Sequence, residues 1–116
     1  MVKEYFRLER RRMNVTEREV SKEEAIKLIE EALLKTGLVI ETPDYIYALF
    51  EKEPDRWINV SLVFEDKTGW VSEVDTKRAL LLLMDEVSKS LSQYKGEWKP
   101  ILDEVELQNI LAKKFS

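Results

Sequence analysis

Hydrophobic residues recur along this chain in two spacings, one typical of helices and one typical of strands. The most apolar helical segment is residues 75–93, where one stripe of side chains repeats at helical spacing. Leu81 and Leu82 lie off this stripe, so the first half of the segment is apolar on nearly all sides. Such a helix is normally buried on several sides. We therefore expect it to be the central helix, packed on a sheet and covered by another element. Its stripe consists of Leu80, Leu83, Met84, Val87 and Leu91.

A second helix is predicted over residues 22–36. Ser21 and Glu24 have the spacing of a capping box, which begins a helix. Gly37 is placed to end it, because glycine readily adopts the conformation that follows a helix. The buried stripe of this helix is predicted to be Ala25, Leu28, Ile29, Ala32 and Leu33.

A last helix is predicted over residues 101–115, either broken or with a late start near Asp103. Its apolar residues fall on two opposite sides, so it is either sandwiched inside the domain or shared with a second chain. One side carries Leu107, Ile110, Leu111 and Phe115, and the other carries Ile101, Leu102 and Val105.

Between the first two helices, four segments have strand character. Turn sequences rich in Pro, Asp and Gly separate them, and such short connections favour antiparallel neighbours. The third segment alternates cleanly, with Ile58, Val60, Leu62 and Phe64 on one face and Trp57, Asn59, Ser61 and Val63 on the other. The four segments are residues 38–41, 45–52, 56–65 and 70–73.

The segment 45–52 is apolar on both faces of its strand. Tyr45, Tyr47 and Leu49 share one face, and Ile46, Ala48 and Phe50 share the other. An uncovered apolar sheet face is rare in a monomer, so we expect a terminal segment or a second chain to cover it. Nucleic-acid bases stacked on the sheet aromatics are the alternative cover. Those aromatics are Tyr45, Tyr47, Trp57 and Trp70.

Residues 3–20 have two interpretations. Phe6 and Leu8 alternate as in a strand, and Met13 and Val15 alternate on the opposite parity. One extra residue between these pairs, a β-bulge, would put all four side chains on one face. A short helix over residues 2–13 is the competing interpretation, and we favour the strand.

These elements predict one α+β domain over residues 1–116. Its sheet is an antiparallel meander of three or four strands, with helices packed on one face. The expected order of elements is β-α-β-β-β-α-α.

Composition narrows the class of protein. Charged residues make up 36% of the chain, which has no cysteine; such enrichment is typical of thermophilic proteins. The net charge is −4, although residues 1–20 alone hold six basic and four acidic side chains. No apolar stretch is long enough for a transmembrane helix. We expect an intracellular, cytoplasmic protein without a membrane anchor.

The absence of histidine and cysteine is the most informative chemical feature. It excludes Ser-His-Asp and Cys-His catalytic groups and the usual zinc sites. The three glycines lie at predicted turns or helix ends, so no phosphate-binding loop is predicted. Acidic pairs such as Asp85-Glu86 are expected on solvated helix faces. We therefore expect no enzyme, no cofactor and no metal, with a carboxylate-Mg²⁺ phosphate-ester hydrolase as the remaining catalytic alternative.

One local basic patch stands out near the N-terminus. It could hold nucleic-acid phosphates or an acidic partner, but interleaved glutamates favour ion pairs within the protein. The patch consists of Lys3, Arg7, Arg10, Arg11, Arg12 and Arg18.

The leading functional prediction is a small interaction module without catalysis, which self-associates as a two-fold homodimer. It rests on three features: the strand 45–52 is apolar on both faces, the last helix is apolar on two opposite sides, and the central helix is apolar on nearly all sides. Nucleic-acid binding through the arginine patch and the sheet aromatics is the alternative. The predicted interface residues are Tyr45, Tyr47, Trp57, Leu107, Ile110, Leu111 and Phe115.

Overall fold

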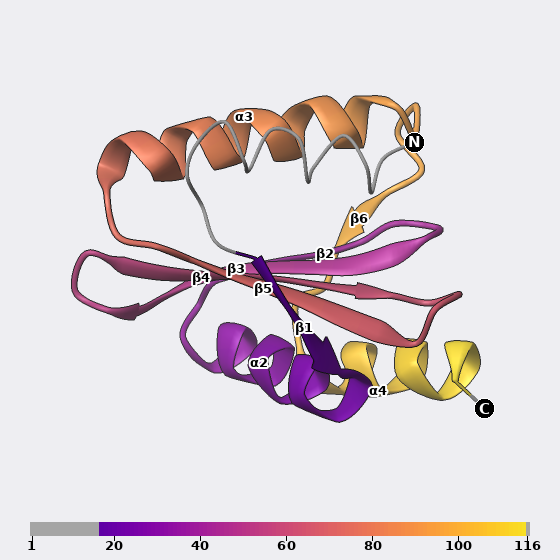
Figure 1. Ribbon diagram of the computed structural model, residues 1–116. Helices are drawn as coiled ribbons and strands as arrows, with labels where there is room; N and C mark the ends of the chain where they lie inside the picture. The colour runs from indigo at the N-terminus through magenta and orange to yellow at the C-terminus, as the bar shows by residue number, and fades with distance from the viewer. Residues whose placement is uncertain (1–16, 116) are drawn as a thin grey trace.

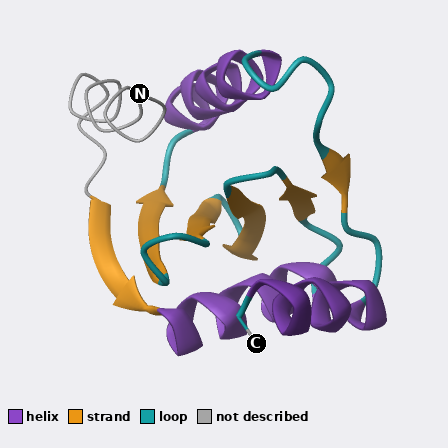
Figure 2. Ribbon diagram, turned by 90° about the vertical axis from the view of Figure 1, so that its right-hand side faces the viewer, coloured by secondary structure: helices purple, strands orange, loops and turns teal. Residues whose placement is uncertain are grey.

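The computed structural model describes residues 17–115 and shows an α+β fold in three layers. A six-stranded sheet forms the middle layer, in the order β1-β5-β4-β3-β2-β6, and every neighbouring pair is antiparallel. Helices lie on both faces of it (Figures 1 and 2). The strands are β1 (Glu17–Ser21), β2 (Leu38–Glu41), β3 (Tyr45–Glu53), β4 (Arg56–Val63), β5 (Thr68–Val74) and β6 (Lys99–Pro100). The helices are α2 (Lys22–Leu34), α3 (Lys77–Ser92) and α4 (Glu104–Lys114).

The predicted meander is confirmed as β2–β3–β4–β5, with each strand paired to the next. Two of its turns contain a residue in the left-handed region, Asp55 (φ 64°) and Lys67 (φ 54°), which reverses the chain within a few residues. The sheet is larger than predicted because β1 adds to β5 and β6 adds to β2. β6 lies between the segments predicted as the central and last helices, where no strand was predicted.

β1 agrees with the strand interpretation at the end of the segment 3–20. The remainder of that prediction lies outside the described residues. It includes the β-bulge and the shared face of Phe6, Leu8, Met13 and Val15.

α2 begins where the capping box predicts. The Ser21 hydroxyl accepts a hydrogen bond from the Glu24 amide at 3.1 Å, so one of the unpaired amides of the first turn is satisfied. The helix ends two residues earlier than predicted. Thr36 (φ 52°), rather than Gly37, takes the left-handed conformation after it. Gly37 is required for another reason, because a Cβ there would lie 2.6 Å from the Leu49 carbonyl oxygen.

α2 and α4 cover one face of the sheet and enclose the larger apolar core. Gly69 of β5 permits this close packing, since a Cβ at that position would lie 2.6 Å from the Ala25 Cβ. The sheet contributes alternate residues of its central strands, as the strand parity predicted. The fully covered side chains include Ala25, Ile29, Ala32, Ile46, Ala48, Val60, Leu62 and Leu107.

α4 runs antiparallel to α2, so the two helices meet along their lengths. The Lys22 ammonium lies 5.1 Å from the centre of the Phe115 ring at one end of the pair. Towards the other end, the Gln108 amide donates to Glu30 at 3.1 Å and to Glu104 at 3.0 Å. The Asp103 carboxylate caps α4 by accepting a hydrogen bond from the Glu106 backbone amide at 2.8 Å, which agrees with the late start.

Among the described helices, only α3 lies on the opposite face, and this corrects two expectations. Helices do not share one face of the sheet, and the outer side of α3 remains exposed. Leu83 is fully buried, whereas Leu81, Leu82 and Met84 are 58%, 43% and 48% exposed. The topology supplies the reason. The connection from β1 to β2 passes over one face of the sheet and contains α2, whereas the connection from β5 to β6 passes over the other face and contains α3 (Figure 1).

Leu83 anchors α3 to the sheet, so its truncation should destabilise the protein strongly. We expect Leu83→Ala to lower the free energy of unfolding by about 2–5 kcal/mol, because a buried side chain is lost and a cavity remains. Leu82→Ala is the matched control on the exposed side, with an expected change of about 0.5 kcal/mol or less. Chemical denaturation measures both. A loss below about 0.5 kcal/mol for Leu83→Ala would contradict the packing of α3 described here.

The contact between α2 and α4 predicts a pH-dependent effect. A hydrogen bond with Glu104, burial and the negative charge of Glu104 raise the pKa of Glu30. The protonated form is therefore favoured in the folded protein, and this stabilisation is lost as pH rises through the raised pKa. Glu30→Gln should raise the free energy of unfolding more at pH 7 than at pH 3. The difference between the two pH values should be less than about 1 kcal/mol.

Glu31→Gln provides the control for this experiment. The Glu31 carboxylate lies 3.6 Å from the Lys35 ammonium and 3.9 Å from that of Lys52, so its removal should lower stability at pH 7. Thermal denaturation of the three proteins at both pH values compares the two signs. Equal effects of Glu30→Gln at pH 3 and pH 7 would contradict the prediction.

Candidate functional site

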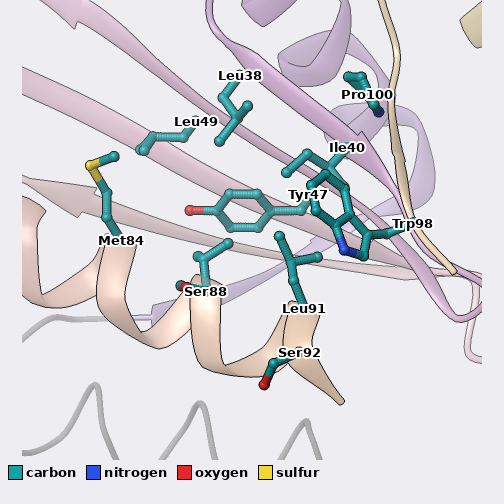
Figure 3. Close-up of a pocket in the computed structure, with 11 residues that line it drawn as sticks. Leu38, Ile40, Tyr47, Leu49, Met84, Ser88, Leu91, Ser92, Trp98 and Pro100 are labelled. Atoms are coloured by element: carbon teal, nitrogen blue, oxygen red, sulfur yellow. The ribbon is translucent and has the colours of Figure 1, made fainter. Parts of the chain in front are cut away.

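An apolar groove of about 500 Å³ lies between α3 and the β2–β3 side of the sheet (Figure 3). Its floor is made by alternate residues of the two strands, which point to the α3 face. Its wall is one edge of α3. Trp98 and Pro100, on the chain segment that returns to the sheet, complete the lining. The floor residues are Leu38, Ile40, Tyr47 and Leu49, and the wall residues are Met84, Val87, Ser88, Leu91 and Ser92.

Local sequence explains why these side chains meet. β2 and β3 are paired so that Leu38 faces Leu49 and Ile40 faces Tyr47, which places all four on one sheet face. The wall residues of α3 follow the spacing i, i+3, i+4, i+7 and i+8, which gives one helix edge. The groove therefore arises from a strand period on one side and a helix period on the other.

Two hydrogen bonds fix the C-terminal end of α3 over the sheet. The Tyr45 and Ser90 hydroxyls lie 2.9 Å apart, and the Tyr94 hydroxyl donates to the Asp44 carboxylate at 3.0 Å. The Tyr45 and Tyr94 rings also pack edge to face, with centroids 6.0 Å apart. Burial, and then the bond to Asp44, raise the pKa of Tyr94, so its hydroxyl stays protonated and remains a donor.

The return segment after α3 is fixed by strand β6. Pro100 pairs with Ile40 and Lys99 pairs with Glu41, whose carboxylate lies 3.6 Å from the Lys99 ammonium. This pairing holds Trp98 beside the groove, where its side chain is 39% exposed. Figure 3 shows Trp98 and Leu91 at one end of the groove and Met84 and Leu49 at the other.

The groove continues into an exposed apolar rim. Leu38 and Met84, which line it, are 42% and 48% exposed. Leu81 lies one turn before Met84 on the same edge of α3 and is 58% exposed. Large exposed apolar side chains that adjoin a hollow are unusual on a surface that contacts only water. We define the groove and Leu38, Leu81, Met84 and Trp98 as the groove face.

The interface residues predicted from sequence do not form one surface. Tyr45 and Tyr47 are buried beneath α3, and Trp57 is partly buried against the same cluster. Phe115 packs on the opposite core, with its ring 5.9 Å from that of Phe64. Only Tyr47 reaches the groove, as part of its floor. The remaining three predicted residues, Leu107, Ile110 and Leu111, are buried in the core beneath α4.

Of the predicted basic patch, only Arg18 lies among the described residues. It is exposed on β1, and its guanidinium bonds the Glu24 carboxylate at 2.9 Å. This agrees with the preference for ion pairs within the protein at that position. Lys3, Arg7, Arg10, Arg11 and Arg12 lie outside the described residues.

Sequence reasoning missed the residues that form the rim. Trp98 lies in a connector with no periodicity, so nothing in the pattern placed it beside α3. The off-stripe position of Leu81 was a usable signal, but we took it as evidence for a second covering layer. The correct meaning was an exposed apolar edge.

A buried polar cluster occupies another part of the same sheet face. Asn59 and Ser72 face each other across β4 and β5, and Ser61 lies two residues further along β4. They are 0%, 1% and 8% exposed, respectively. Within the described part of the chain, the side chains of Asn59, Ser61 and Ser72 make no hydrogen bond. Buried polar groups without partners are costly, so this cluster weakens the packing of the sheet.

Two further observations bear on function. Among residues 17–115, no cluster of three acidic side chains has the geometry to hold a metal ion, and no helix is both long and apolar enough to cross a membrane. Comparison with protein-family models, with curated proteins and with solved structures finds no match to this chain.

The polar cluster yields a stability prediction. Asn59→Leu should raise the free energy of unfolding by about 1–3 kcal/mol, because it removes buried polar atoms that lack hydrogen bonds. Thr42→Val is the matched control: the Thr42 hydroxyl accepts from the amides of Asp44 and Tyr45 at 3.2 and 3.0 Å, so its loss should destabilise. Urea denaturation measures both variants. A destabilised Asn59→Leu protein would contradict this prediction.

Proposed function

We propose that this chain is an interaction module without catalytic activity, and that its groove face receives apolar side chains of a protein partner. The observation that carries the proposal is the continuity between the groove and its exposed apolar rim. A groove that served only a small enclosed molecule would not need Leu81 and Met84 exposed beside it.

The chemistry of the groove supports an uncharged apolar anchor. Its lining combines aliphatic and aromatic side chains with the hydroxyls of Ser88 and Ser92, and none of the described residues that line it is charged. A charged group placed there would lose water without gaining a counter-charge. Protein interfaces commonly combine an apolar anchor in a pocket with a more polar rim.

The burial of the sheet tyrosines favours a protein partner over nucleic acid. Base stacking needs an accessible ring face, whereas Tyr45 and Tyr47 are 6% and 1% exposed. The polar surroundings of the groove are also mixed in sign. Lys99 is paired with Glu41, and Lys89 is paired with Asp85 at 3.0 Å. Among residues 17–115, no unpaired cluster of basic side chains at the groove favours phosphates.

Selection from a random peptide library, with the full chain as bait, tests the proposal. We expect the selected peptides to carry large apolar residues and to shift the NMR amide signals of α3 and β2. Met84→Glu should weaken their binding at least tenfold, because a charge would be buried at the rim. Leu102→Glu is the control, since Leu102 is 78% exposed next to α4. Peptides that bind the Met84→Glu protein as tightly as the wild type would contradict the proposal.

A further inference from the structure

We infer that the partner at the groove face is a second copy of this chain, bound through antiparallel α3 helices about a two-fold axis. This inference rests on the proposed function. It adds the identity of the partner, and it follows from the shape and charge of the exposed edge of α3.

The two halves of this edge differ in size. The N-terminal half projects Leu81 and Met84 into solvent. The C-terminal half carries the small residues Ser88 and Ser92, which lie beside the groove. Positions 81, 84, 88 and 92 are spaced by three or four residues and so follow one line along the helix. Along one edge of α3, large projecting side chains are therefore followed by small side chains beside a hollow.

A two-fold interface requires a surface that is complementary to itself. Two antiparallel α3 helices meet this requirement, because the N-terminal half of each lies against the C-terminal half of the other. With the axis level with residue 87, Met84 of one copy lies between Ser88 and Leu91 of the other, and Leu81 lies beside Ser92. Each copy then supplies the projections and receives those of its neighbour.

The charges on the edge are complementary in the same arrangement. Asp85 and Lys89 form an ion pair at 3.0 Å within one copy, and their side chains are 62% and 59% exposed. Antiparallel helices bring Asp85 of one copy towards Lys89 of the other, so the four charges alternate in sign across the axis. Like-charge contacts, which oppose association, are avoided.

The sheet edges favour the α3 face over edge-to-edge pairing of strands. β1 carries Arg18 and Glu19, both exposed, and β6 consists of only two residues, one of them Pro100. Charged residues, short strands and proline are the usual means by which proteins prevent such pairing.

Light scattering coupled to size-exclusion chromatography tests the inference with the full chain. We expect a concentration-dependent dimer for the wild type. Leu81→Glu and Met84→Glu should weaken dimerisation at least tenfold, whereas Leu102→Glu should not. Ser88→Leu adds an apolar group but fills the hollow, so it should also weaken the dimer. Circular dichroism confirms that each variant is folded.

Cross-linking tests the direction of the helices. The chain has no native cysteine, so Ser88→Cys places a single thiol close to the axis. We expect this variant to form a disulfide-linked dimer on mild oxidation at low micromolar concentration. Leu102→Cys, which lies far from the axis, should form no disulfide-linked dimer.

A wild type that stays monomeric at high micromolar concentration would overturn the inference, as would dimerisation that Leu102→Glu abolishes and Met84→Glu leaves intact. The peptide selection separates this failure from failure of the proposed function. Peptides that bind a monomeric wild type through the groove would leave the interaction module in place with a different partner.

Discussion

Strand β3 has to bury both of its faces, and the rest of the fold depends on this requirement. All six residues from Tyr45 to Phe50 are at most 8% exposed, although they alternate between opposite sides of the sheet. One layer of helices cannot satisfy such a strand. The chain meets the requirement by crossing the sheet twice, with α2 on one face and α3 on the other.

The groove is a geometric consequence of this solution. Six strands about 4.8 Å apart span roughly 24 Å, whereas a helix with its side chains is about 10 Å wide. Two helices share the α2–α4 face, but α3 alone serves the opposite face among the described elements (Figure 2). Tyr45, Ser90, Tyr94 and Asp44 fix its C-terminal end, so the β2–β3 side beside it forms the floor of an open hollow.

The two helical faces also differ in the quality of their packing. The α2–α4 core is continuous and apolar, and helix caps and ion pairs support it. The α3 face combines an apolar cluster with Asn59, Ser61 and Ser72, whose buried side chains make no hydrogen bond within the described part of the chain. Incomplete packing and incomplete satisfaction of polar groups on one face are common where a protein binds something.

Local sequence determined most of the elements of this protein. The capping residues Ser21 and Asp103 begin their helices where they should, because a cap depends only on its own turn. The alternation in β4 and the turns at Asp55 and Lys67 likewise follow from neighbouring residues. Tertiary structure decided which face of the sheet each helix covers. It also decided that Leu81 is exposed, because the sequence around Leu81 would be the same if another layer covered it. It also decided the site: Trp98 and Tyr47 are 51 positions apart in the sequence, and only the pairing of β6 with β2 brings them to the same groove.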